Sequence, residues 1–157
     1  MELARLAQLP FFQGMPQRAL VGLAEAAAEE EVPAGGIVVR QSDRARVVHF
    51  LLAGSVQILL RVGEEDLLVA VLRRPGELLG WSAFRAPYRY TASVRCEEPS
   101  RPVRVPAAVF EELFARDPGL AYQILQRVAT GVANRLEHAR ERLCLAPGRA
   151  LGEESER

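Results

Sequence analysis

A change of periodicity constrains what this chain can fold into. Between Val32 and Val105 the apolar residues come in short runs that are separated by Gly, Pro and Asp, whereas the residues on both sides follow helical periodicity. Runs of this length, bounded by turn residues, are typical of β-strands. Many short strands at nearly regular spacing favour a sandwich, roll or barrel over a parallel α/β sheet. The sequence therefore predicts a mainly β fold with flanking helices (α+β).

Four helical segments are predicted outside the β region. Residues 2–8 form a short helix that ends before Pro10, because a residue that precedes proline is pushed out of the α region. A second helix is predicted from Pro16 to about Glu30, and a third opens at Pro106. The longest follows Asp117, an N-cap residue, and is predicted to reach about Leu143.

The long C-terminal helix carries apolar residues on two sides. One row, which includes Leu120, Ile124 and Val128, is expected to face the β region. A second side repeats every seven residues, which is the spacing of a coiled-coil seam. This seam consists of Leu125, Ala129, Val132, Leu136, Ala139 and Leu143. Because only a polar tail remains to cover it, the sequence predicts a homodimer that forms through this helix.

Length and composition set the broad class. A chain of 157 residues suits one domain, predicted at residues 1–144, with a polar tail at residues 145–157 that is expected to be disordered. The formal net charge is zero, so we expect no direct binding to nucleic acid. No apolar run is long enough to span a bilayer and no signal peptide is visible, which predicts a cytoplasmic protein with no membrane contact.

Catalytic and metal-binding patterns are missing from the sequence. His49 and His138 lack a second ligand at metal spacing, and Cys96 and Cys144 form no metal motif. The Ser, His and acidic residues show no nucleophile elbow. We therefore expect no enzyme activity and no metal site.

The stretch from Pro75 to Val94 combines residues that suit a phosphate. Gly76 allows close approach of the backbone, Glu77 can accept hydrogen bonds from a sugar hydroxyl, and an apolar turn that closes at Gly80 is followed by a short helix. Arg89 adds a positive charge just before the alternating run that starts at Thr91. The pattern predicts a cradle for a small anionic ligand.

This stretch resembles the phosphate-binding part of the cyclic-nucleotide-binding domain in catabolite activator protein and Fnr-type regulators. Gly76-Glu77-Leu78 match the first half of the family's pattern, and Thr91-Ala92 match the end of the second. The resemblance implies an antiparallel β-roll, a jelly-roll-like double-stranded β-helix, with N-terminal helices and a long C-terminal dimerisation helix. No helix-turn-helix is visible in the sequence, so the resemblance implies a stand-alone sensor that signals through a separate effector protein.

The resemblance also implies a ligand and its contacts. The ligand would be cAMP or cGMP, with no covalent cofactor. Its contacts would be Gly76, Glu77, Leu78, Gly80, Arg89, Tyr90, Thr91 and Ala92. Anchoring on Thr91 puts Tyr90 where the family has its phosphate-binding Arg and leaves Arg89 one residue early, and a bulge near Pro87 would restore Arg89 to the pocket. The alternative is a degenerate family member that binds another small anion or no ligand and acts as a dimeric interaction module.

Overall fold

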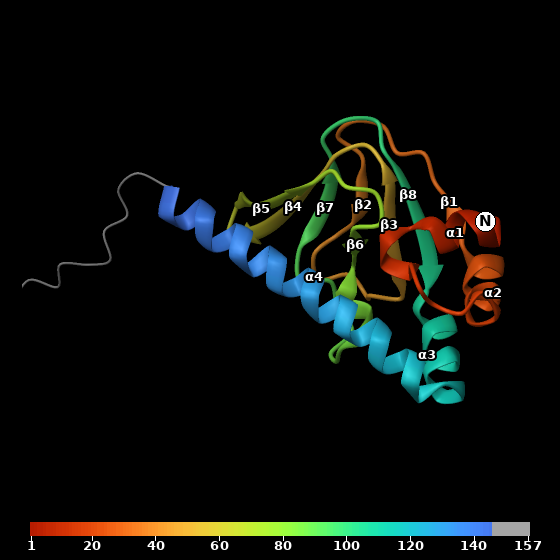
Figure 1. The fold of residues 1–157 in the computed structure, drawn as a ribbon. Helices are drawn as coiled ribbons and strands as arrows, with labels where there is room; N and C mark the ends of the chain where they lie inside the picture. The colour runs from red at the N-terminus through yellow and green to blue at the C-terminus, as the bar shows by residue number, and fades with distance from the viewer. Residues whose placement is uncertain (146–157) are drawn as a thin grey trace, which may run out of the picture.

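Two antiparallel sheets form the centre of the molecule (Figure 1). The computed structural model describes residues 1–145, and within this range the strands pair in the orders β1-β8-β3-β6 and β2-β7-β4-β5. The strands are β1 (Ala28–Glu29), β2 (Ile37–Val39), β3 (Val47–Ala53), β4 (Val56–Val62), β5 (Glu65–Leu72), β6 (Leu78–Leu79), β7 (Ser93–Cys96) and β8 (Arg101–Pro106). The predicted antiparallel β-roll with flanking helices is confirmed.

Helices cover one end and one side of this roll. The helical segments are α1 (Leu3–Gln8), the 3₁₀ turn η1 (Pro10–Phe12), α2 (Gln17–Ala26), the 3₁₀ turn η2 (Trp81–Phe84), α3 (Ala107–Arg116) and α4 (Pro118–Leu145). Helices α1, α2 and α3 gather at one end, and α4 runs from α3 along the roll toward the β4–β5 hairpin (Figure 1).

Helix α2 is shorter than predicted. It ends at Ala26, and Ala27 already has extended backbone angles. Glu29 then pairs with Val103 at the edge of the sheet that contains β8. The prediction of a helix to Glu30 was wrong because backbone hydrogen bonds to β8 outweigh the local helical tendency, and a sequence pattern does not contain those long-range partners.

An aromatic cluster fixes the N-terminal segment to the roll. The ring centroid of Phe50, at the centre of β3, lies 4.9 Å from that of Phe11 and 4.9 Å from that of Phe12. Phe110 of α3 approaches the same ring at 6.4 Å. Tilted aromatic pairs at these distances add to the hydrophobic burial. The cluster thus joins η1, β3 and α3 in one core.

Helix α4 presents two different apolar sides, as predicted. Leu120, Ile124 and Val128 are buried against the domain. Leu125, Leu136 and Leu143, by contrast, are 43%, 52% and 76% exposed, so these three leucines of the seam are largely uncovered. Leu145 ends α4, and the rest of the tail predicted at 145–157 lies outside the described residues.

Neither a membrane span nor a metal cluster is found in the part of the chain that the structure describes. Each helix within residues 1–145 is too short or too polar to cross a lipid bilayer. No group of three His, Cys, Asp or Glu side chains is arranged to hold a metal ion in that range.

Candidate ligand-binding site

Gly80 forms a tight corner between β6 and η2. Its φ of +76° lies in the left-handed region, which glycine adopts without the strain that a Cβ causes. A Cβ at this position would lie 2.9 Å from Cε1 of Tyr90 and 3.2 Å from the carbonyl oxygen of Val47. The corner therefore needs glycine both for its backbone angles and for the close approach of the Tyr90 ring.

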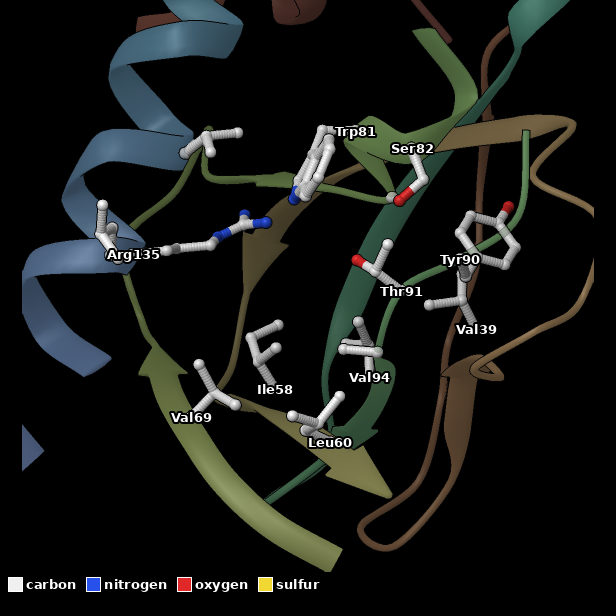
Figure 2. Close-up of a pocket in the computed structure, with 14 residues that line it drawn as sticks. Val39, Ile58, Leu60, Val69, Trp81, Ser82, Tyr90, Thr91, Val94 and Arg135 are labelled. Atoms are coloured by element: carbon white, nitrogen blue, oxygen red, sulfur yellow. The ribbon is translucent and has the colours of Figure 1, made fainter. Parts of the chain in front are cut away.

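A cavity of about 310 Å³, here called the Gly80 cavity, opens between this corner, the roll and α4 (Figure 2). Apolar side chains from the strands make its floor, and Trp81 and Ser82 of η2 stand beside the corner. The floor consists of Val39, Ile58, Leu60, Val69 and Val94. Val132, Arg135 and Leu136 contribute the wall from α4. The cavity is thus lined partly by the helix that carries the predicted seam.

Arg135 supplies the charge of the Gly80 cavity. Its guanidinium reaches from α4 into the cavity toward Trp81 (Figure 2). Of the described residues that line the cavity, Arg135 is the only basic one, and none is acidic. Burial lowers the pKa of Arg135 to about 10, while the negative charge of Glu77 acts in the opposite direction. Among the described residues, no carboxylate lies within ion-pair distance of Arg135, and a partly desolvated cation of this kind is a favourable contact for an anionic ligand.

Four of the sequence-predicted site residues meet at this cavity: Gly80, Tyr90, Thr91 and Ala92. The Tyr90 hydroxyl points away from it and donates a hydrogen bond of 2.8 Å to the carbonyl oxygen of Val47 (Figure 2). Burial also raises the pKa of the Tyr90 phenol. Tyr90 thus lines the cavity with its ring, while its hydroxyl donates its hydrogen bond to Val47.

Gly76, Glu77 and Leu78 lie at a different cavity. Gly76, at φ +84°, donates its N–H to the carbonyl oxygen of Leu51 at 2.7 Å and packs against Pro10. Glu77 accepts a hydrogen bond of 2.8 Å from the backbone N–H of Arg74. All three residues line a cavity of about 670 Å³, here called the Glu77 cavity, on another side of α4.

The separation of the two glycines has a simple cause. Leu78 and Leu79 are the strand β6, in which they pair with Phe50 and His49 of β3. An extended segment holds Gly76 and Gly80 apart, whereas the predicted apolar turn would have brought them together. The prediction of an apolar turn that closes at Gly80 was therefore wrong. The glycine that precedes the short helix η2 is Gly80. The residue after it is Trp81, whereas Gly76 is followed by the acid Glu77.

Arg89 lines neither cavity. The side chain is exposed, and Nη1 donates a hydrogen bond of 2.8 Å to the carbonyl oxygen of Ser42. The backbone of Arg89 forms an antiparallel bridge with Arg44, which fixes this orientation. The loop around Pro87 thus does not restore Arg89 to the pocket, and the expectation that Arg89 meets Gly76 in one cradle is corrected.

Arg135 was not among the predicted site residues, although the sequence contains one signal for it. The core-facing row of α4 continues from Leu120, Ile124 and Val128 to positions 131 and 135. An arginine on a row that faces the protein interior needs an explanation, because charged side chains are rarely buried without a partner.

Comparisons with known proteins bear on the family and the fold of this chain. The sequence pattern of the cyclic nucleotide-binding domain family matches residues 29–117, which is more than half of the chain. The chain is similar to a candidate cyclic nucleotide-binding protein from Geobacter metallireducens GS-15, with 26% identity, a TM-score of 0.76, and 87% of this chain and 98% of that chain covered. No curated protein sequence matches the chain.

Two further structures share the fold at lower identity. The sensor domain of the transcriptional regulator DNR from Pseudomonas aeruginosa is 18% identical, with a TM-score of 0.70 over 82% of this chain and 91% of that one. The catabolite activator protein of Thermus thermophilus is 22% identical, with a TM-score of 0.65 over 87% of this chain and 62% of that one. The resemblance noted in the sequence is thus confirmed, and the chain belongs to the cyclic nucleotide-binding domain family.

Proposed function

We propose that this chain is a regulatory sensor domain that binds a small anionic ligand in the Gly80 cavity and transmits its occupancy through α4. The observation that carries the proposal is the position of Arg135, the one cation among the described residues that line the cavity. Because Arg135 belongs to α4, an anion that pairs with it contacts the helix and the roll together. We expect a regulatory role rather than an enzymatic one.

Cyclic nucleotides are the first ligand class to test, because the chain belongs to a family that is named for them. A cyclic phosphate would pair with Arg135, and its base would stack near Trp81 or lie on the apolar floor. This places the charged contact on α4 rather than on Arg89.

A second ligand class is supported by the absence of an acid among the described lining residues. Without a carboxylate, the ribose hydroxyls of a nucleotide lose a strong acceptor. The lining instead suits an anion with a largely apolar body. This agrees with the alternative of a relative that binds another small anion.

Two residues of α4 connect ligand binding in the Gly80 cavity to the predicted dimer. Val132 and Leu136 line the Gly80 cavity and also belong to the predicted seam. A ligand that contacts them favours the arrangement of α4 that fits it best, and so shifts the dimer between arrangements. We propose a homodimer that acts on a separate effector protein in the cytoplasm.

The test is a titration with cAMP, cGMP and the apolar anion 8-anilinonaphthalene-1-sulfonate. Binding is followed by calorimetry and, for the nucleotides, by the emission of Trp81, the single Trp of the chain. Arg135→Gln should weaken binding about tenfold or more, since a charge-assisted hydrogen bond is lost. Arg89→Gln is the matched control and should keep wild-type affinity.

The outcomes separate the alternatives. Binding of a cyclic nucleotide that depends on Arg135 supports the first ligand class, and Arg135-dependent binding of the apolar anion alone supports the second. If none of the three ligands binds at millimolar concentration, the sensor proposal is rejected and the dimeric interaction module remains.

A further inference from the structure

The Glu77 cavity carries an excess of positive charge. At about 670 Å³ it is larger than the Gly80 cavity, and it lies between α4, the Gly76 turn and the Pro10–Phe11 segment. Four arginines and His138 line it, together with a single acid, Glu77. The whole chain has equal numbers of acidic and basic residues, so this excess of positive charge is local.

Most of these arginines lack an acidic partner. Arg73 pairs with Glu97 at 2.8 Å. Within the described residues, no carboxylate lies within ion-pair distance of Arg74, Arg127 or Arg135. Glu77 is engaged by a backbone N–H rather than by a guanidinium. Arg74, Arg127 and Arg135 thus share one concave surface with the single carboxylate of Glu77, and the excess of positive charge raises the local concentration of anions.

Arg127 is held in place by the fold. Its Nη2 donates to the carbonyl oxygen of Gln13 at 2.7 Å, and its Nη1 donates to that of Phe11. These two acceptors fix the guanidinium but leave its positive charge unneutralised. A preorganised guanidinium loses less freedom when it binds an anion than a mobile one does.

Gly131 is a second and independent feature of this cavity. It lies in the middle of α4, where glycine is less favourable than alanine. In the described part of the chain, no atom outside the local helix lies within 4 Å of the place that a Cβ would take there, so packing does not require glycine. A side chain at this position would project toward the Glu77 cavity, which Gly131 lines. Glycine therefore keeps this part of the cavity open.

We propose that the Glu77 cavity is a second anion-binding site, which lies next to the Gly80 cavity and shares Arg135 with it, and that it takes a small ligand with two or more linked phosphate groups. The spread of the arginines favours several phosphates over one. Arg127 and Arg135 are eight residues apart on α4, which is about 12 Å along the helix axis. Arg74 lines the same cavity from the Gly76 turn, and Thr130 and Asn134 of α4 add neutral hydrogen-bonding groups.

Calorimetric titration with tripolyphosphate tests the proposal, with inorganic phosphate and hexaglutamate as comparison ligands. The wild-type chain should bind tripolyphosphate more tightly than inorganic phosphate. Arg74→Glu, on an exposed side chain, should weaken that binding about tenfold or more. Gly131→Leu should weaken it to a similar degree by filling the cavity while the charges stay in place. Arg101→Glu makes the same charge change at an exposed arginine outside both cavities and should keep affinity within about twofold.

Circular dichroism of each variant checks that the fold is intact. Equal binding by wild type, Arg74→Glu and Gly131→Leu would overturn the proposal, and so would the absence of tripolyphosphate binding at millimolar concentration. Binding of hexaglutamate alone would also overturn it, and would identify a docking surface for an acidic protein segment. No ligand of the Gly80 cavity is used, so failure of the sensor proposal leaves this result interpretable.

Discussion

The hydroxyl of Tyr90 donates a hydrogen bond of 2.8 Å to the backbone carbonyl of Val47. This bond ties the start of the Thr91 segment to the first residue of β3 and turns the hydroxyl away from the Gly80 cavity (Figure 2). Tyr90 therefore has a structural part at the position where the family resemblance placed a phosphate-binding arginine.

Removal of that hydroxyl should affect stability rather than binding. Tyr90→Phe keeps the ring against Gly80 and loses one hydrogen bond, so the free energy of unfolding should fall by about 1 kcal/mol. Urea denaturation measures this change. Ligand affinity in the Gly80 cavity should stay at the wild-type value, and a loss comparable to that of Arg135→Gln would mean that Tyr90 contacts the ligand.

A comparison of Gly35 and Gly80, which have nearly the same φ, distinguishes the cost of backbone strain from the cost of a steric clash. Gly35 has a φ of +78°, and a Cβ at this position would meet no atom within 4 Å, whereas a Cβ on Gly80 meets Tyr90 and Val47. Gly35→Ala should lower the free energy of unfolding by about 1 kcal/mol through backbone strain. Gly80→Ala should lower it by at least about 1 kcal/mol more, because overpacking adds to the strain. Equal effects in thermal or urea denaturation would show that the corner has room for a Cβ.

Arg135 should be dispensable for folding. Its desolvated charge lacks a carboxylate partner within the described residues, so Arg135→Met should leave the free energy of unfolding unchanged or raise it by about 1 kcal/mol. Arg127→Met is the matched comparison, and it should be destabilising because Arg127 holds the carbonyl oxygens of Phe11 and Gln13. A strong loss of stability in Arg135→Met would indicate a structural role for this guanidinium instead.

Dimerisation should depend on the seam of α4. Leu136 is 52% exposed in the single chain, and burial between two helices would stabilise the dimer. Leu136→Glu places a charge in that contact and should shift the chain to monomer in sedimentation equilibrium. Gln123→Glu introduces the same side chain at another exposed position of α4, outside the seam, and should leave the oligomeric state unchanged. A monomeric wild-type chain at high protein concentration would contradict the predicted seam.

His49 should make the protein less stable in mild acid. Burial, reinforced by the positive charge of Arg104, lowers its pKa from 6.5 to about 4, and Nδ1 has no hydrogen-bond partner within residues 1–145. The unfolded chain then binds a proton at higher pH than the folded one, so stability falls as the pH drops from about 6.5 to about 4. The loss attributable to His49 should reach about 3 kcal/mol.

Urea denaturation at several pH values checks this sign. His49 faces Glu30, with Oε2 4.0 Å from Nε2, as well as Arg104 from β8. His49→Leu should flatten the dependence between pH 4 and 6.5, whereas the exposed His138, replaced by alanine, should leave it as in the wild type. If both variants lose stability in parallel with the wild type, carboxylates and not His49 cause the effect.

Local sequence predicted much of the scaffold correctly. The continuous apolar run from Val47 to Ala53, followed by Gly54, predicts a strand, and β3 has those bounds. Gly54 has a φ of +99°, and a Cβ at this position would collide with Ser100, so the turn after β3 requires glycine. The two apolar sides of α4 were likewise readable, because helical periodicity assigns side chains to faces. The bounds of β3 and the two sides of α4 could be predicted because they depend on residues that are close in the sequence.

The site was predicted less well, for a different reason. Gly80, Tyr90, Thr91 and Ala92 do surround one cavity, but Gly76 and Glu77 lie at another. Whether Leu78-Leu79 form a turn or a strand depends on their pairing with β3, which is distant in sequence. The direction of Arg89 depends in the same way on a carbonyl oxygen of the segment around Ser42.

The sequence by itself determined a mainly β fold with flanking helices and the two apolar sides of α4, because periodicity and turn residues act over short distances along the chain. The roll was implied by the family resemblance. Only the tertiary structure decided which charge reaches the cavity. Arg135 lies 55 residues beyond Gly80 in the sequence, and it enters the Gly80 cavity because the apolar row of α4 packs on the roll. A contact of that kind is set by packing between distant segments, which no local pattern specifies.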